Sequence, residues 1–255
     1  MERMLEEQGL ISAIVATTPA RHSHSDEDEG KPLSDEAHQL QPLLPLRPDV
    51  AFATNRLARR LSAPTALDVW EPKRAPRHPL GTLSRALSTD VRDKTCHRLT
   101  VFTDPDGADD KLPRKAVSSE VIHVDHPLVS SGCRTNSVLS CSATRGVSEG
   151  KYIPESFRAR GLNVDLLFVV DSTAAIGVAS RRGRQRLWLF DVRLLWLKEA
   201  CATNGIRTTK VPERQNAAEG NTKATDRKAL ESCRYTAGVL PRPTWGAVAA
   251  LQPAL

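Results

Sequence analysis

Apolar residues early in the chain follow a helical spacing in two places. Residues 2–16 carry a loosely helical pattern that stops at the Thr-Thr-Pro sequence after them. Residues 47–62 (RPDVAFATNRLARRLS) open with Pro-Asp and repeat apolar side chains at i, i+3 and i+4, which predicts an amphipathic helix. The charged run between them predicts a solvated loop, and Pro72, Pro76 and Pro79 exclude a continuous helix further on. This part of the chain is expected to be partly helical and partly disordered.

Short β-strand patterns follow. Residues 99–103 (LTVFT) form the first, and residues 118–124 (SSEVIHV) and 135–140 (TNSVLS) are two more of suitable length. Residues 164–170 (VDLLFVV) are apolar without alternation, as expected of a strand buried on both faces of a mixed or parallel sheet. These four segments predict a sheet in the middle of the chain.

The last third of the chain alternates between helix and strand patterns. Residues 172–180 predict a short helix, residues 190–204 a longer one with a wide apolar face, and residues 219–234 a final polar helix. Residues 206–211 (IRTTKV) predict a short strand between the last two helices. Strands first, followed by this alternation, predict an α/β or α+β fold.

Two aspartates stand at the ends of predicted strands. Asp104 follows the first strand, and Asp171 follows the long apolar one. In open sheets the active site lies at the carboxyl ends of adjacent strands, so both are placed as a metal-binding pair would be. Aspartate is also a common turn residue, and spacing alone favours the interpretation that each one merely ends a strand.

Composition narrows the class of protein only a little. The 255-residue chain has a formal net charge of +6, which favours polyanionic partners because Lys and Arg displace counterions from phosphates. Aromatic residues make up only 4% of the chain, and it has 17 prolines. Separate ordered regions are therefore expected more than one uniformly packed domain. The five cysteines form no Cys-x-x-Cys pair and are expected to be reduced thiols. The N-terminal apolar run is too short for a membrane span or a secretory signal, so an intracellular location, cytoplasmic or nuclear, is expected.

Several segments, read in order, resemble one polyprotein region. They are MLEEQGLISAIVATTP, RPDVAFATNRLARRLSAPT, WEPKRAPRHPLGT, VFTDPDGADD, RKAVSSEVIHVDHPLVSSGCRTNSVLS, VDSTAAIGVASRRG, FDVRLLWLKE and TTKVPERQNAAEGNTK. Their order resembles that of copia-type retrotransposon Pol polyproteins, where the end of the reverse transcriptase runs into a ribonuclease H domain. The resemblance implies a degenerate copy with a reverse transcriptase remnant over residues 1–96, a ribonuclease H-like mixed sheet flanked by helices over residues 97–240, and a tail over residues 241–255.

The resemblance also implies a chemistry. It is two-metal hydrolysis of the RNA strand in an RNA–DNA hybrid, with carboxylates holding two divalent ions, usually Mg²⁺. Asp104 matches the acid at the end of the family's first strand, and Asp171 the acid before its Ser-x-Ala-Ala helix. Glu219, in NAAEGNTK, stands where the family usually has Asp, and its extra methylene would displace the ligand oxygen. The family's Glu-Ala-Glu-Tyr motif is deleted here, and Glu149 matches a later Ser-Glu-Gly instead. Ribonuclease activity is therefore expected to be weak or lost, and no polymerase activity is expected.

A cluster of arginines follows the short helix predicted after the second aspartate, near where the family handles the phosphates of the hybrid. These residues are Arg181, Arg182, Arg184 and Arg186. A solvated basic turn accounts for them equally well, because runs of Arg are common in exposed loops. Two alternatives to a ribonuclease therefore stay open: a non-catalytic, basic nucleic-acid-binding protein, and a relic with no selected role.

Overall fold

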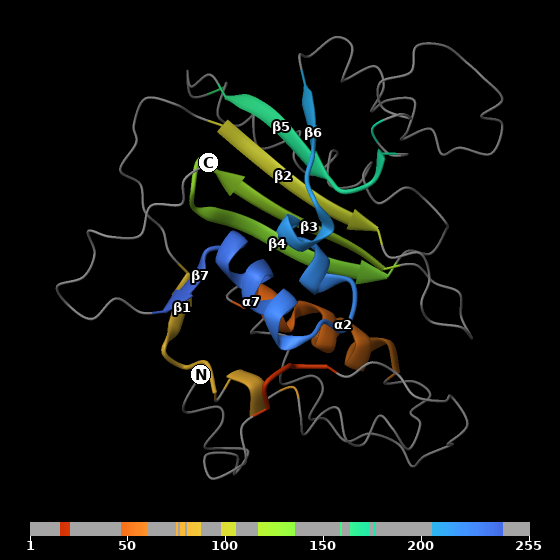
Figure 1. Ribbon diagram of the computed structural model, residues 1–255, viewed down its shortest axis with the longest axis vertical. Coiled ribbons are helices and arrows are strands. Elements are labelled where there is room, and N and C mark those ends of the chain that lie inside the picture. The colour runs from red at the N-terminus through yellow and green to blue at the C-terminus, as the bar shows by residue number, and fades with distance from the viewer. Residues whose placement is uncertain are drawn as a thin grey trace, which may run out of the picture.

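The computed structural model describes residues 16–20, 47–60, 75, 77–79, 81–87, 98–105, 117–135, 159, 164–173, 176 and 206–241. Within these ranges the chain forms a five-stranded sheet, a two-stranded sheet and two α-helices (Figure 1).

The main sheet is mixed, with strand order β4-β3-β2-β5-β6. Its strands are β2 (Arg98–Pro105), β3 (Val117–Val124), β4 (Leu128–Thr135), β5 (Asp165–Val170) and β6 (Arg207–Lys210). The pairs β2–β3 and β3–β4 are antiparallel, whereas β2–β5 and β5–β6 are parallel. Strand β2 is thus where the antiparallel half meets the parallel half.

Apolar side chains fill the middle of the sheet. Val101 is fully buried and pairs with Ile122 on one side and Phe168 on the other, so these three lie on one face. Val121 lies on the opposite face and packs with Ala237 and other small residues from the last part of the chain. Because side chains alternate along a strand, the sheet has an apolar layer on both faces.

Two helices lie beside the β3–β4 half of the sheet (Figure 1). Helix α2 (Ala51–Arg60) continues a 3₁₀ turn, η2 (Pro48–Val50), and a proline suits the first turn of a helix because its missing N–H would be unpaired there anyway. Helix α7 (Arg227–Thr236) begins at Asp226, whose Oδ1 accepts a hydrogen bond from the Ala229 N–H at 2.7 Å. It ends just before Gly238, whose φ of 76° favours glycine.

Segments far apart in the sequence share a core. Strand β1 (Arg85–Leu87) pairs antiparallel with β7 (Val239–Pro241), and Val50 and Leu57 pack in one apolar cluster with Ala224. The domain boundary predicted at residue 96 stays a prediction, but residues on its two sides are packed together.

Most predicted elements that fall within the described ranges are confirmed. The helix at 47–62 and the strands at 99–103, 118–124, 164–170 and 206–211 are present, and the predicted mixed α/β sheet with flanking helices is confirmed. Among the described residues, no helix is both long and apolar enough to cross a membrane.

One predicted helix begins in the wrong place, and the strands β1, β4 and β7 were not predicted. The final helix starts at Arg227, not at Glu219, because the intervening Gly-Asn-Thr favours turns over helix. The third strand is β4, whose sequence LVSSGCRT has few bulky β-formers. The strand predicted at 135–140 lies outside the described residues except for Thr135. The helices predicted at 172–180 and 190–204 lie outside them too, apart from residues 172, 173 and 176.

Candidate active site

The register between β2 and β5 brings the two predicted aspartates together. Arg98 pairs with Asp165 and Phe102 with Val169, a constant offset along parallel strands. Continued to the strand ends, this offset places Asp104 level with Asp171, the residue directly after β5. Neighbouring strands lie about 4.8 Å apart, and residues level with each other point to the same face. The two carboxyl groups therefore share one face at the carboxyl ends of adjacent parallel strands.

A turn after β6 brings the third predicted acid to the same edge. Asn216, which is fully buried, donates from Nδ2 to the Thr103 carbonyl at 3.0 Å and accepts from the Ala218 N–H at 3.1 Å. The 3₁₀ turn η5 (Glu219–Asn221) follows, so Asn216 anchors this segment to the end of β2. The asparagine is thus the structural link between Glu219 and the strand that carries Asp104.

Gly220 packs closely against helix α7 inside this turn. A Cβ added at Gly220 would lie 3.1 Å from Cβ and 3.3 Å from Sγ of Cys233 on α7. Contacts this close leave little room for any side chain. Gly220 therefore lets the acid-bearing turn pack directly on the helix.

Among the described residues, Thr222 and Lys223 contact two of the acids directly. The Thr222 hydroxyl makes a short hydrogen bond to Oδ2 of Asp104 and also lies 3.0 Å from the Glu219 carbonyl. A hydroxyl has one proton, and a charged acceptor makes the stronger bond, so donation to Asp104 is favoured. Lys223 Nζ lies 3.3 Å from Oε1 of Glu219 and also pairs with Glu213.

The acids influence one another through their charges. Burial raises the pKa of Asp104, and the Thr222 hydroxyl works against that rise by stabilising the charged form. The charge of Asp171 raises the pKa again, Lys223 lowers it and Glu219 raises it, with a result of about 6 against the ordinary 3.8. The pKa of Glu219 is also raised, first by burial, with Asp171 adding to the rise. The three carboxyl groups therefore behave as one electrostatic site.

The donor type of this site suits a hard cation such as Mg²⁺, but its arrangement does not complete a metal shell. Oε2 of Glu219 is buried and has no hydrogen-bond partner among the described residues, so one carboxylate oxygen is left for a ligand. Against this, no three His, Cys, Asp or Glu side chains in the described part of the chain are grouped as metal ligands. Thr222 and Lys223 already engage Asp104 and Glu219. The residues therefore fit the metal in chemistry and not in arrangement.

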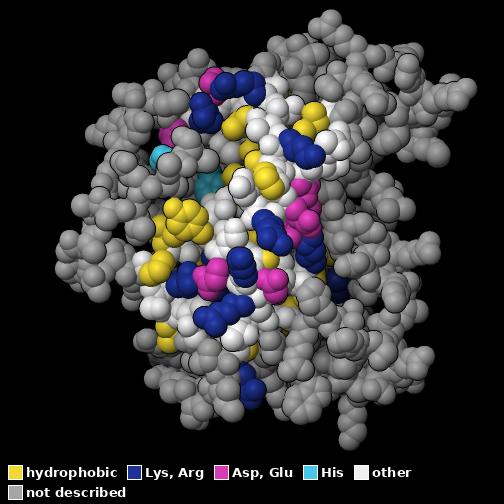
Figure 2. Space-filling view, in the orientation of Figure 1, with side chains coloured by type: hydrophobic (Ala, Val, Ile, Leu, Met, Phe, Trp, Pro, Cys, Tyr) yellow, Lys and Arg dark blue, Asp and Glu magenta, His cyan; other side chains and the backbone are white. Residues whose placement is uncertain are grey.

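The other predicted site residues lie outside the described ranges. These are Glu149, Arg181, Arg182, Arg184 and Arg186. On the face shown in Figure 2, Lys and Arg side chains alternate with Asp and Glu over the area that α7 forms. The arginine cluster stays a prediction.

Four residues of the site were not predicted from the sequence. They are Glu213, Asn216, Thr222 and Lys223. All four stand in or beside the segment PERQNAAEGNTK, which also carries Glu219. Their closeness to Glu219 in the sequence is the signal by which they could have been predicted as site residues. The contacts of Asn216 and Thr222 with β2 depend on a turn geometry that no spacing rule gives.

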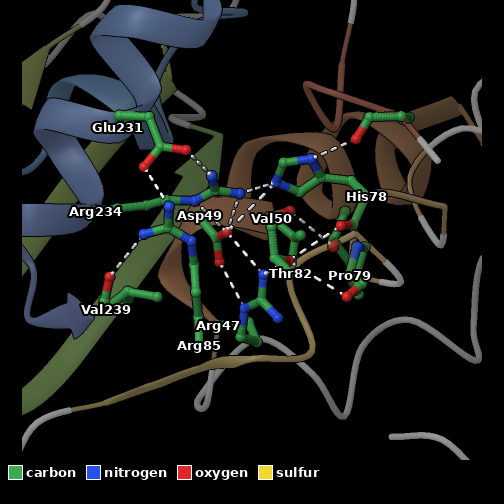
Figure 3. A network of polar contacts seen from close by, with 12 residues as sticks. Arg47, Asp49, Val50, His78, Pro79, Thr82, Arg85, Glu231, Arg234 and Val239 are labelled. Carbon is green, nitrogen blue, oxygen red and sulfur yellow. Dashed lines mark hydrogen bonds and ion pairs between the residues drawn. The ribbon is translucent and has the colours of Figure 1, made fainter. Parts of the chain in front are cut away.

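Another buried acid, Asp49, lies in a polar network (Figure 3). Asp49 accepts from Nε and Nη2 of Arg47, both at 2.9 Å, and from Nε of Arg234 at 2.8 Å. His78 Nε2 lies 3.4 Å from Asp49 Oδ2 and contacts the Arg234 guanidinium. Glu231 accepts from Arg234 at 2.9 Å and from Arg85 at 2.6 Å. The network therefore joins η2 to α7 and β1.

The comparisons with known proteins concern only the overall shape. No protein-family model matches the chain, and no curated protein matches it. Among solved structures, one similar chain is the N-terminal RNase H domain of a Mycobacterium tuberculosis protein, fused to maltose-binding protein. It is 14% identical, with a TM-score of 0.35, over 55% of this chain and 99% of that one. Another is RNase H1 from the halophilic archaeon Halobacterium salinarum, 16% identical, with a TM-score of 0.32, over 54% of this chain and 98% of that one.

Both are ribonucleases H. The strand order and register of the main sheet show a mixed α/β fold.

Proposed function

We propose that the chain descends from a copia-type retrotransposon and is a low-activity ribonuclease H that cleaves the RNA strand of RNA–DNA hybrids. Support comes from the collinear sequence resemblance and from one structural observation. Asp104 and Asp171 stand level at the ends of adjacent parallel strands, with Glu219 beside them. A carboxyl group whose pKa is raised by burial and by other acids is typical of a functional site, although structural networks also shift pKa values.

The residues of this edge have distinct roles in the proposal. Asp104, Asp171 and Glu219 would supply the hard carboxylate oxygens that divalent ions need. In the described arrangement Thr222 and Lys223 engage two of these acids, and the metal shell is incomplete. The Thr222 hydroxyl orients the Asp104 carboxylate and favours its charged form. Asn216 fixes the turn that carries Glu219 to the end of β2. The low activity follows from Glu219 in place of Asp and from the deleted fourth acid.

The test is cleavage of a labelled RNA–DNA hybrid by the purified full chain in Mg²⁺. We expect slow cleavage that is lost in Asp104→Asn and in Asp171→Asn. Asp165→Asn is the matched control, because Asp165 lies at the other end of β5 in an exposed pair with Arg207. Cleavage that survives in both active-site variants would come from a contaminating nuclease and would contradict the proposal.

A non-catalytic nucleic-acid-binding protein is the second candidate. One observation favours it: the acids are engaged by Thr222 and Lys223, and no three ligating side chains are grouped in the described residues. In this case the folded chain would bind hybrid without cleaving it. The affinity would fall steeply with salt and would be unchanged in Asp171→Asn. Binding that is insensitive to salt would exclude this candidate.

A further inference from the structure

Lys223 is a partly exposed basic side chain at the acidic edge. Its ammonium lies 3.3 Å from Oε1 of Glu219 and also pairs with Oε1 of Glu213. Its charge acts on Asp104 as well, lowering that carboxyl's pKa. A single ammonium therefore interacts with two of the three acids proposed as metal ligands.

The two ion pairs of this lysine differ in environment. The Glu213 side chain is 59% exposed, so water and salt weaken that pair. The Glu219 side chain is only 8% exposed, and its interaction with the ammonium is screened much less. The pair with Glu219 is thus the one that compensates a buried charge. The pair with Glu213 holds the ammonium in place.

Compensation by an ammonium has a consequence for metal binding. Asp104 and Glu219 both gain from a nearby positive charge, because burial disfavours their charged forms. A divalent ion at this edge would meet the same carboxylates and would be repelled by the ammonium beside them. The buried Oε2 of Glu219 has no hydrogen-bond partner among the described residues, so this carboxylate still has an oxygen that a cation could use.

We propose that Lys223 is a built-in cation of the acidic edge: it neutralises the carboxylates in the metal-free protein and thereby weakens divalent-metal binding there. The inference rests on the proposed function, since it concerns the same three acids. Weaker metal binding would be a second cause of the proposed low activity, in addition to the deleted acid. In this role Lys223 acts through Glu219 and Asp104 and is a positioning residue.

The test measures metal binding and needs no cleavage. Mn²⁺ binding to the full chain is followed by electron paramagnetic resonance at a pH about two units above the pKa of Asp104, where the carboxyl groups are ionised. Two variants remove the charge: Lys223→Met and Lys223→Gln. The Gln amide still donates hydrogen bonds, so this variant keeps the test usable if Lys223→Met does not fold. Lys223→Arg keeps the charge. Lys228→Met is the control, because Lys228 is exposed on α7 and its loss changes the net charge equally.

We expect Lys223→Met and Lys223→Gln to bind Mn²⁺ about tenfold more tightly than the unaltered chain, since a unit charge close to the ion is removed. Lys223→Arg and Lys228→Met should change the affinity by less than about twofold. In chelator, both charge-removing variants should unfold at a lower temperature than Lys228→Met, and added Mn²⁺ should raise their unfolding temperature more.

Two contrary outcomes are distinguishable. Measurable Mn²⁺ binding that is equal in Lys223→Gln and Lys228→Met would overturn the inference and leave the proposed function intact. Absence of Mn²⁺ binding in every folded protein would overturn the proposed metal site, and the competition with it.

Discussion

Two buried aspartates of this chain have opposite electrostatic environments. Asp49 is 5% exposed and Asp104 is 6% exposed, so both carboxyl groups have lost nearly all contact with water. Burial raises the pKa of Asp49, but hydrogen bonds from Arg47 and His78 and the charges of Arg47 and Arg234 bring it well below its ordinary value. Asp104 has a neutral hydroxyl, other acids and one lysine around it, and its pKa rises to about 6.

The difference separates a structural acid from a candidate functional one. At Asp49 the guanidinium groups of Arg47 and Arg234 satisfy both carboxylate oxygens, and the pair joins η2 to α7. At Asp104 the negative charge is only partly compensated, and the two nearest acids add to it. A fold keeps an under-compensated buried charge at a cost in stability, which is common where activity requires the charge.

Removing the charge at Asp49 should have the largest effect on stability. Asp49→Asn leaves two buried guanidinium groups without their shared carboxylate, and breaking a buried pair in this way costs about 3–5 kcal/mol. Urea unfolding near neutral pH measures the loss. The same change at the exposed Asp165 should cost less than about 1 kcal/mol. Equal losses in the two variants would show that the Asp49 network is not a structural centre.

The same substitution at Asp104 should act in the opposite direction. A folded-state pKa raised above the ordinary 3.8 means that folding favours the protonated form, so stability falls as the pH rises from about 4 to about 6. Asp104→Asn removes this loss and should stabilise the protein by up to about 3 kcal/mol above pH 6. Urea unfolding across the pH range checks this. Destabilisation at high pH would contradict the comparison.

Lowering the pH should reduce the stability contributed by the Asp49 network, whereas it raises the contribution of Asp104. The depressed pKa of Asp49 contributes stability above the ordinary pKa of 3.8, and that stability is lost progressively as the pH falls below this value. In Asp49→Asn the acid-induced loss should be smaller than in the unaltered chain. Thermal unfolding at several acidic pH values measures it, and an unchanged slope would contradict the assignment.

The smallest expected effect concerns the hydroxyl beside Asp104. Thr222→Val removes a donor to the charged carboxylate, which should raise the pKa of Asp104 further and cost about 1 kcal/mol where that group is ionised. Thr236→Val is the control, because within the described ranges the Thr236 hydroxyl donates to the Ser232 carbonyl of its own helix and to no other group. An unchanged pH profile in Thr222→Val would show that the hydrogen bond does not stabilise the charged form.

The sequence predicted the acidic site around Asp104 better than the polar network around Asp49. Asp104 and Asp171 were found because each ends an apolar strand, and the β2–β5 register, continued to the strand ends, places them level. Glu219 was found by resemblance, although its turn was taken for the start of a helix. Thr222 and Lys223 were missed, because contacts across a turn have no periodic signal.

The Asp49 network could not be predicted from local patterns. Pro-Asp at the start of a helix usually indicates a solvent-exposed first turn. Here the aspartate is buried because its partner Arg234 comes from α7, 185 residues further along the chain. Strand β4 was missed for a different reason: its sequence has few bulky β-formers. Its place depends on pairing with β3 and on contact with α2, where Asn55 donates to the Cys133 carbonyl at 3.1 Å.

The most direct test of a single acidic site is the titration of the Asp104 carboxyl group, followed by carbon-13 NMR. The account predicts a midpoint near pH 6 in the unaltered chain. Asp171→Asn should lower the midpoint, because it removes a neighbouring negative charge, whereas Asp165→Asn should leave it unchanged. A midpoint near 4 that does not respond to Asp171→Asn would show that Asp104 and Asp171 do not form one site.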